Sequence, residues 1–320
     1  MKFSIIMPAY NAEKFIDIAI KSVTAQEYPL WELIIVNDGS TDSTLDKVKA
    51  WAKEEPRIIY LNQNNGGKPS IARNNGLKRA TGEYICFLDA DDTYEPSRLA
   101  QCQQFFLKNP VTPLWFSDFS TINEQGNRLE NAYLNNRDFL EKALEKRFDH
   151  LVSYTPDTVI FNKQFLQFMA CETTAIHTIT ICIKSSLLKD GFGFDDDLTI
   201  GEDLDLWFRL VSNNQIGYCP QALSQYRINP NSITKQNEKM LVGTYDSHIK
   251  NLTRYKQLLT STTRSLYKKK ISQHASHLGF YYRQQRLLKT SFHYYLQALK
   301  LNPSVANILN IIKLILFIKR

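Results

Sequence analysis

The chain has 320 residues, of which 43% are hydrophobic and 22% charged, a globular composition that excludes disordered, collagen-like and disulfide-scaffold proteins. Its net charge of +7 is unevenly distributed. Residues 235–320 contain 16 basic and two acidic side chains, a balance of +14, which leaves −7 for residues 1–234. We therefore expect two parts, an acidic domain over 1–234 and a basic extension over 235–320.

Five cysteines are scattered along the chain without a CxxC pair, and their apolar neighbourhoods predict reduced core thiols. Reduced thiols are typical of a cytoplasmic protein. The apolar stretch at the N-terminus is interrupted by Pro8 and is too short for a secretion signal. No run of 18 apolar residues is present, so we expect no membrane-spanning helix.

The first 110 residues alternate short β-rich runs with stretches of helical periodicity. Strands are expected at 3–7, 33–36, 58–61 and 84–88, and helices at 15–23 and 45–52. This alternation predicts an α/β fold with a parallel sheet and right-handed crossovers. The loops contain neither GxGxxG nor GxxxxGK[ST], which disfavours dinucleotide binding and a P-loop.

The pattern is weaker after residue 114. We expect a turn at 125–126, a helix over 137–148, a strand over 177–183, a helix over 201–213, strands over 215–219 and 223–228, and helices from 235 onward. Ligands of parallel sheets bind beyond the carboxyl ends of the strands, so the polar residues at those ends are the candidates for function.

An acidic segment, Asp89-Ala90-Asp91-Asp92, follows the fourth predicted strand. Where the chain turns, Asp89 and Asp91 can converge, and two close carboxylates favour a Mg²⁺ or Mn²⁺ ion that holds substrate phosphates. The alternative is a cluster that caps the helix that follows, because Asp favours the N-cap and the first turn.

Two further loops follow the first and second strands. They contain Pro8, Ala9, Tyr10, Asn11, Asp38 and Gly39. Asp38 can accept a hydrogen bond from a nucleobase or a ribose, the glycine lets the backbone approach a ligand, and the Tyr10 ring can pack on a base. The alternative is an ordinary turn capped by Ser40 or Asp42.

Two helices also carry candidate charges. Arg73 can reach a diphosphate, or it can be a solvated surface charge. Glu202 and Asp203 open a later helix at a position suited to a general base, or they complement the helix dipole. For Asp205 and Arg209 we favour a structural ion pair at i,i+4.

Together these motifs resemble the family 2 glycosyltransferases of the GT-A fold. The motifs are Ile5–Asn11, Val36–Asp42, Ala72–Gly76, Tyr84–Asp92 and Gly201–Asp203, in that order over about 230 residues. The resemblance implies an inverting enzyme that transfers a sugar from a nucleotide diphosphate, usually UDP, to an acceptor hydroxyl.

The resemblance also implies residue roles. Nucleotide contacts are expected from Pro8, Ala9, Tyr10, Asn11, Asp38, Gly39, Arg73, Asp89 and Ala90. Asp91 is the expected ligand of Mn²⁺ or Mg²⁺ in a DxD motif, with Asp89 as a second candidate. Asp203 is the expected base, and Glu202 is the alternative base.

One departure from the family concerns residue 229. Members often carry histidine in a Tyr-Arg-x-His-Pro setting, whereas this chain has Asn229 after Tyr226-Arg227-Ile228. An amide oxygen is a weaker metal ligand than imidazole, so we expect at most a weak contribution from Asn229.

The basic extension contains residues at the spacing of one tetratricopeptide repeat over 275–303, followed by an apolar helix over 304–318. With basic residues around it, this last helix is expected to dock on an anionic membrane surface. The alternatives are an intramolecular contact or a homodimer contact; RNA binding has no recognisable module behind it.

These expectations describe a cytoplasmic, peripherally membrane-associated glycosyltransferase of bacterial surface polysaccharide or glycoconjugate synthesis, with a UDP-hexose or UDP-N-acetylhexosamine donor and a glycan or lipid-linked acceptor. A sugar-nucleotide pyrophosphorylase is the first alternative, but it would show a Gly-rich phosphate loop after the first strand. A non-catalytic nucleotide-sugar-binding scaffold is the second, and the intact Asp91 and Asp203 argue against it.

Overall fold

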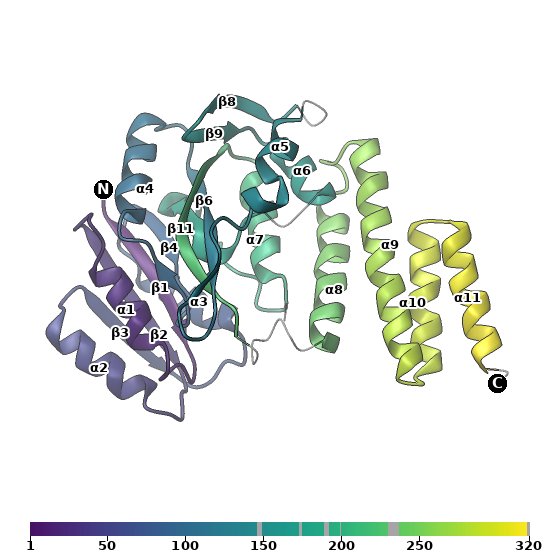
Figure 1. Cartoon of the computed structure of the whole chain (residues 1–320), viewed down its shortest axis with the longest axis horizontal. Helices are drawn as coiled ribbons and strands as arrows, with labels where there is room; N and C mark the ends of the chain where they lie inside the picture. The colour runs from purple at the N-terminus through teal and green to yellow at the C-terminus, as the bar shows by residue number, and fades with distance from the viewer. Residues whose placement is uncertain (146–148, 173–174, 189–191, 199, 230–236, 319–320) are drawn as a thin grey trace. The chain divides into compact units, whose positions relative to one another are not determined.

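The computed structural model describes residues 1–145, 149–172, 175–188, 192–198, 200–229 and 237–318. The chain divides into two compact units (Figure 1). The α/β unit comprises Met1–Phe165, Thr174–Asp197 and Glu202–Asn229; the helical unit comprises Leu166–Thr173, Leu198–Gly201 and Pro230–Arg320. The expected boundary at 234/235 lies outside the described residues.

The first half of the α/β unit is the predicted alternation of strands and helices. Its elements are β1 (Phe3–Ala9), α1 (Ile16–Thr24), β2 (Trp31–Asp38), α2 (Thr44–Glu54), β3 (Ile58–Gln63), α3 (Pro69–Arg79) and β4 (Tyr84–Phe87). All four strands are parallel, in the order β3-β2-β1-β4. Every residue of β2 is buried, as expected of a parallel strand with both faces covered.

The second half adds antiparallel strands. Its elements are β5 (Thr93–Tyr94), α4 (Arg98–Lys108), β6 (Leu114–Ile122), β7 (Arg128–Glu130), η1 (Asn135–Arg137), α5 (Phe139–Leu144), β8 (Leu151–Thr155), β9 (Thr158–Phe161), η3 (Thr178–Thr180), β10 (Ile181–Lys184), η4 (Ser185–Leu188), α7 (Glu202–Val211) and β11 (Ile216–Arg227). β10 lies antiparallel between β4 and β6, and β11 is parallel to β6. The sheet is therefore mixed, with the order β3-β2-β1-β4-β10-β6-β11-β9-β8.

The predicted pair of strands over 215–219 and 223–228 is wrong, because β11 is one continuous strand. Its pairing with β6 shifts register between Cys219 and Ala222, on either side of Pro220. Proline lacks a backbone donor, so the sequence indicates a break where the strand only bulges.

Two other predictions need correction. The strand expected over 177–183 begins only at Ile181, because Thr178–Thr180 forms the 3-10 helix η3. The helix expected over 137–148 is limited to Phe139–Leu144 in the described chain, and residues 146–148 lie outside it. Asp138 adopts a left-handed φ of 56°, which separates η1 from α5.

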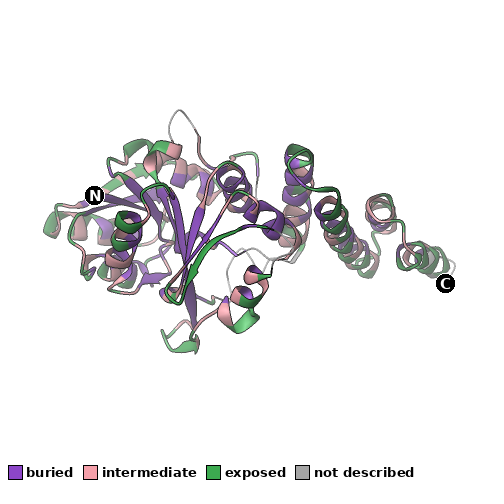
Figure 2. Ribbon diagram, turned by 90° about the horizontal axis from the view of Figure 1, so that it is seen from above, coloured by how far each residue is buried: buried purple, intermediate pink, exposed green. Residues whose placement is uncertain are grey.

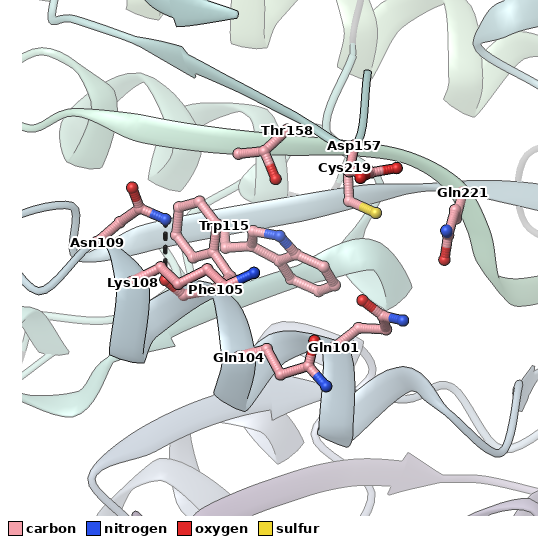
Figure 3. A pocket seen from close by; sticks show the side chains of 10 residues that line it. All are labelled: Gln101, Gln104, Phe105, Lys108, Asn109, Trp115, Asp157, Thr158, Cys219 and Gln221. Carbon is pink, nitrogen blue, oxygen red and sulfur yellow. Dashed lines mark hydrogen bonds between the residues drawn. The ribbon is translucent and has the colours of Figure 1, made fainter. Parts of the chain in front are cut away.

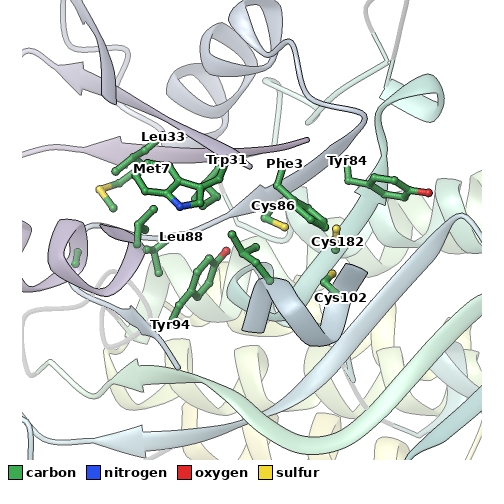
Figure 4. Packing of buried hydrophobic residues seen from close by; sticks show 14 of the residues in the cluster. Phe3, Met7, Trp31, Leu33, Tyr84, Cys86, Leu88, Tyr94, Cys102 and Cys182 are labelled. Atoms are coloured by element: carbon green, nitrogen blue, oxygen red, sulfur yellow. The ribbon is translucent and has the colours of Figure 1, made fainter. Parts of the chain in front are cut away.

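The core of the α/β unit lies between the sheet and its helices, where the strands are buried and the outer helix faces are exposed (Figure 2). Aromatic rings from the sheet and from helix α4 pack together there: the ring centroids of Tyr84 in β4 and Phe106 in α4 are 4.0 Å apart. The thiols of Cys86, Cys102 and Cys182 are buried in this cluster (Figure 4). Their burial agrees with the prediction of core thiols.

The helical unit contains α6 (Phe165–Cys171), α8 (Asn237–Tyr255), α9 (Ser261–Gln284), α10 (Leu288–Leu301) and α11 (Val305–Ile318). α9 packs on α10 at Gly279, where an added Cβ would lie 2.5 Å from the Tyr295 ring. Asn307 joins α11 to this pair by donating to Ser272 Oγ and to the Ala298 carbonyl. The helix pair exists, while its membership of the tetratricopeptide repeats remains a prediction.

Candidate active site

The candidate site lies at the carboxyl ends of β1, β2 and β4. Ala9 pairs with Asn37, and Leu88 donates to the carbonyl of Ile6, so the loops that follow these strands leave the sheet side by side. The order of the strands therefore brings the predicted loops at 8–11, 38–42 and 89–92 to one edge.

Asn11 joins the loops after β1 and β2. It has a left-handed φ of 47°, its backbone N–H donates to Ser40 Oγ, and its side-chain Oδ1 accepts from Thr41 N at 2.8 Å. Tyr10 next to it is 52% exposed, so its ring is free to pack against a planar ligand. Asp42 accepts from Thr44 N at the start of α2, so the predicted turn-capping role holds for Asp42.

Asp38 is buried and held by the last residue of β3 and by the loop that follows it. Its Oδ1 accepts from Gln63 Nε2 at 2.6 Å and from Gly66 N at 2.8 Å. Gly39 has a φ of 69°, and a Cβ there would lie 2.7 Å from Asn65 N. The glycine thus allows the loop after β3 to approach, a contact that the sequence analysis did not anticipate.

Arg73 is buried, with 5% of its surface exposed, so its interpretation as a solvated surface charge is wrong. It lies on the buried side of α3, together with Ser70, Ala72 and Gly76. Its Nη2 donates to Asp89 Oδ1 at 2.7 Å, and its Nη1 donates to Glu202 Oε1 at 3.1 Å. Asp89 and Glu202 together outweigh the effect of burial and raise the pKa of Arg73, although burial alone would lower it.

The acidic segment carries three carboxylates, of which Asp89 is paired with Arg73, while Asp91 and Asp92 are only partly compensated by Arg227. Burial and the charge of Asp89 raise the pKa of Asp91 to about 6. Asp92 is buried, its Oδ1 accepts from Arg227 N, and its Oδ2 has no hydrogen-bond partner within the described structure. The helix-cap alternative is wrong, because the segment leads into β5 and α4 starts only at Arg98.

A divalent cation fits this chemistry. Within the described ranges, no three His, Cys, Asp or Glu side chains form a metal cluster. Mg²⁺ commonly takes only one or two protein carboxylates and completes its shell with phosphates and water. The Asp91 carboxylate has a raised pKa, so a nearby cation would stabilise its ionised form. Asp89 Oδ1 already accepts a hydrogen bond from Arg73. Asn229 lies two residues beyond β11, and its metal role remains a prediction.

Two acids open α7 beside this edge. Burial and the charge of Asp203 raise the pKa of Glu202 to about 7, although Arg73 opposes the shift. Asp203 accepts from Leu204 N through Oδ1 and from Thr178 Oγ1 through Oδ2, at 3.4 Å. The predicted pair of Asp205 and Arg209 is confirmed at 2.8 Å.

A groove of about 240 Å³ lies elsewhere in the α/β unit (Figure 3). Its described walls come from α4, β6, β9 and β11 and include Trp115 and Cys219. The predicted site residues are absent from those walls. This groove therefore is not the candidate active site.

Comparison with known proteins identifies the family of this chain. Residues 4–168 match Glycosyl transferase family 2, a range that contains Asp38, Arg73 and Asp91 and ends before α7. A putative teichuronic acid biosynthesis glycosyltransferase of Bacillus subtilis, TuaG, is 29% identical over 76% of this chain and 85% of its own.

Two further proteins are similar. The Escherichia coli UDP-Glc:alpha-D-GlcNAc-diphosphoundecaprenol beta-1,3-glucosyltransferase WfgD is 29% identical over 76% of this chain and 83% of its own. The structure of Staphylococcus aureus TarS residues 1–349 in complex with UDP superposes with a TM-score of 0.59 at 19% identity, covering 93% of this chain and 81% of that one. The fold is therefore GT-A, and the chain is a glycosyltransferase that belongs to glycosyl transferase family 2.

Proposed function

We propose that this glycosyltransferase is an inverting enzyme that takes its sugar from a UDP-linked donor bound at the ends of β1, β2 and β4. The observation that supports this most is the position of Arg73, which links Asp89 of the donor edge to Glu202 at the start of α7. The UDP bound by TarS and the UDP-Glc in the name of WfgD support the choice of nucleotide.

In the proposed reaction, the Asp203 carboxylate accepts the proton of an acceptor hydroxyl. The oxygen forms a bond to the anomeric carbon as the bond from that carbon to the nucleotide diphosphate breaks, and the configuration inverts. Glu202 is the alternative base, since a pKa of about 7 suits proton transfer at neutral pH. Because Glu202 Oε1 already accepts a hydrogen bond from Arg73, Asp203 is our first choice for the base.

The nucleotide is proposed to lie between Tyr10 and Asp38, with Asp91 holding a Mg²⁺ or Mn²⁺ ion and Asp89 able to contribute. When bound, such a cation neutralises the charge that develops on the departing diphosphate. Pro8, Ala9, Gly39 and Ala90 shape the backbone around this space, and Asn11 fixes the two loops relative to each other.

The two alternatives make different demands on these residues. A pyrophosphorylase needs a Gly-rich phosphate loop after β1, and that position holds Pro8-Ala9-Tyr10-Asn11. A non-catalytic scaffold has no use for a buried Glu202 with a pKa near 7, since burying a carboxylate is costly. Both alternatives are therefore less well supported than transfer.

The proposed setting is surface glycan synthesis with a glycan or lipid-linked acceptor, as the names of TuaG and WfgD suggest. No helix in the described ranges is both long and apolar enough to cross a bilayer. Asn307 and Leu314 are buried, so part of α11 makes the intramolecular contact that was the alternative to membrane docking. Its other face is exposed and apolar, with Val305, Ile308, Leu309, Ile312, Ile315 and Leu316.

We propose that this exposed face associates with an anionic membrane, because it belongs to a segment, residues 235–320, whose 16 basic and two acidic side chains favour an anionic surface. This would place the enzyme peripherally on the inner face of the plasma membrane, next to a lipid-linked acceptor. A homodimer contact through the same face is the alternative.

Titration calorimetry of UDP tests the donor site. We expect Mg²⁺ or Mn²⁺ to tighten UDP binding to the wild-type protein and to have no such effect on Asp91→Asn. Asp157→Asn makes the same charge change on the exposed turn between β8 and β9 and serves as the control. If the cation has the same effect on wild type and Asp91→Asn, the proposed role of Asp91 is wrong.

A further inference from the structure

A cluster of four rings from separate segments lies near α7. Phe119 of β6 is fully buried, and Tyr133, His177 and Tyr226 lie half-buried around it. The centroid of the Phe119 ring is 4.6 Å from that of Tyr133, 4.4 Å from that of His177 and 6.3 Å from that of Tyr226. One buried ring thus forms a floor beneath three rings that keep part of their surface exposed.

The cluster is connected to the proposed base. Thr178, the residue after His177, donates from Oγ1 to Asp203 Oδ2 at 3.4 Å. Burial and the charge of Arg137 lower the pKa of His177, and the charge of Asp203 partly offsets this effect. A molecule resting on the rings would therefore lie close to Asp203.

The rim of the cluster is electrically balanced. The Arg137 guanidinium stacks 3.6 Å from the Tyr133 ring centroid, and the same side chain pairs with Glu130 at 3.2 Å. Because this cation already has a carboxylate partner, it does not favour an anionic ligand. The rings of Tyr133 and Tyr226 are apolar apart from their hydroxyls, and the imidazole of His177 adds two nitrogens.

We propose that Tyr133, His177 and Tyr226 form the acceptor platform, on which a neutral pyranoside stacks its C–H face with one hydroxyl directed at Asp203. This inference rests on the proposed transferase function and specifies the substrate class of its acceptor side. A pyranose has an apolar face of axial C–H bonds, which match the negative face of an aromatic ring, while its equatorial hydroxyls remain available to polar groups.

The wild-type protein with UDP and Mg²⁺ provides the first test, by saturation-transfer NMR with methyl β-D-glucopyranoside and methyl β-D-galactopyranoside as probes. We expect the ring C–H protons of one face to receive the strongest saturation, and sorbitol, which has no rigid face, to receive little. Absence of saturation from both probes, or equal saturation of all their protons, would overturn the platform.

Variants locate the contact. We expect Tyr133→Ala and Tyr226→Ala each to weaken probe saturation about fivefold, because an aromatic contact contributes roughly 1 kcal/mol. Tyr60→Ala, which removes a 41% exposed tyrosine from β3, is the matched control and should change nothing. Circular dichroism establishes that each variant is folded, and unchanged saturation in both folded variants would contradict the proposal.

UDP titration of the same wild-type sample distinguishes a failure of the acceptor platform from a failure of the proposed donor site. If UDP binds and the glycosides are not saturated, the acceptor platform fails while the donor function stands. If UDP does not bind with Mg²⁺ present, the proposed donor function fails, and the platform fails with it.

Discussion

Arg73 of α3 donates from Nη1 to Oε1 of Glu202 of α7, at 3.1 Å and across 129 positions of sequence. The same guanidinium holds Asp89, so a single buried cation fixes the start of α7 against the acidic segment after β4. The proposed base and the proposed donor edge are therefore positioned by one residue.

Replacing this cation should destabilise the protein and inactivate it. Arg73→Met retains the side-chain length but leaves Asp89 and Glu202 without their partner, and we expect a loss of about 3 kcal/mol in unfolding free energy. Urea denaturation measures this. Arg79→Met, on the exposed end of the same helix, should change stability by less than about 0.5 kcal/mol. Equal stabilities of the two variants would show that the contacts of Arg73 with Asp89 and Glu202 do not stabilise the fold.

The raised pKa of Glu202 predicts a pH-dependent stability difference. Between its ordinary value of 4.5 and about 7, folded Glu202 keeps a proton that the unfolded chain has lost, so the wild type loses stability as pH rises. Glu202→Gln cannot titrate, and its unfolding free energy relative to wild type should therefore increase from pH 4.5 to 7, on the order of 2 kcal/mol. A difference that is constant with pH contradicts the assignment.

Glu32 gives the control of opposite sign. Burial raises its pKa, but hydrogen bonds from Lys2, Ser4 and Thr81 outweigh burial and lower it overall. The advantage of the wild type over Glu32→Gln should therefore be lost as pH falls below 4.5, and it should not change between pH 5 and 7.

The helical unit has its own pH dependence. Burial, with the nearby Lys270 and His274, lowers the pKa of His248 to about 3, and its Nδ1 lies 2.8 Å from the hydroxyl of Tyr267. Since the unfolded side chain gains a proton near pH 6.5, stability should fall as pH decreases below that value. His248→Phe should cost about 1 kcal/mol at pH 7.5 and less at pH 5.5, as measured by urea denaturation followed at 222 nm. An equal cost at both pH values would be inconsistent with a neutral buried imidazole.

Membrane association through α11 predicts a sedimentation result. Wild-type protein should pellet with phosphatidylglycerol-containing vesicles, and Ile312→Asp with Leu316→Asp should move it to the supernatant, because each removes apolar contact and adds a repelled charge. Leu287→Asp alters an equally exposed leucine outside α11 and should still pellet. Sedimentation of both variants would favour a protein contact for this face.

The sequence predicts the first four strands well because each is a short run of apolar and β-branched residues with a polar loop behind it. It also locates α7, whose apolar positions recur at helical spacing. Local patterns of this kind arise from burial on one sheet or one helix face. The break at Pro220 was misleading because proline interrupts hydrogen bonding without ending β11.

The sequence predicts which residues belong to the candidate site, but not which residues they contact. Asp38, Asp91 and Asp203 follow from motifs, whereas the contacts of Asp38 with Gln63 and Gly66 depend on how β2 pairs with β3 and on the loop after β3. An amide-rich run at the end of β3 and just beyond it, Asn62–Asn65, was the available signal. The burial of Arg73 depends on α7, which lies far along the chain, and no local pattern reports such a pairing.

Turnover of a UDP-sugar by Asp203→Asn tests the central claim most directly. With UDP-glucose and an acceptor glycoside, the account predicts that kcat falls by roughly 10² to 10⁴ while UDP affinity is retained, because a base acts in the transition state. Asp197→Asn, the same change on an exposed loop, should keep its turnover. If Asp203→Asn turns over near the wild-type rate, Asp203 is not the base and the proposed arrangement of the site is wrong.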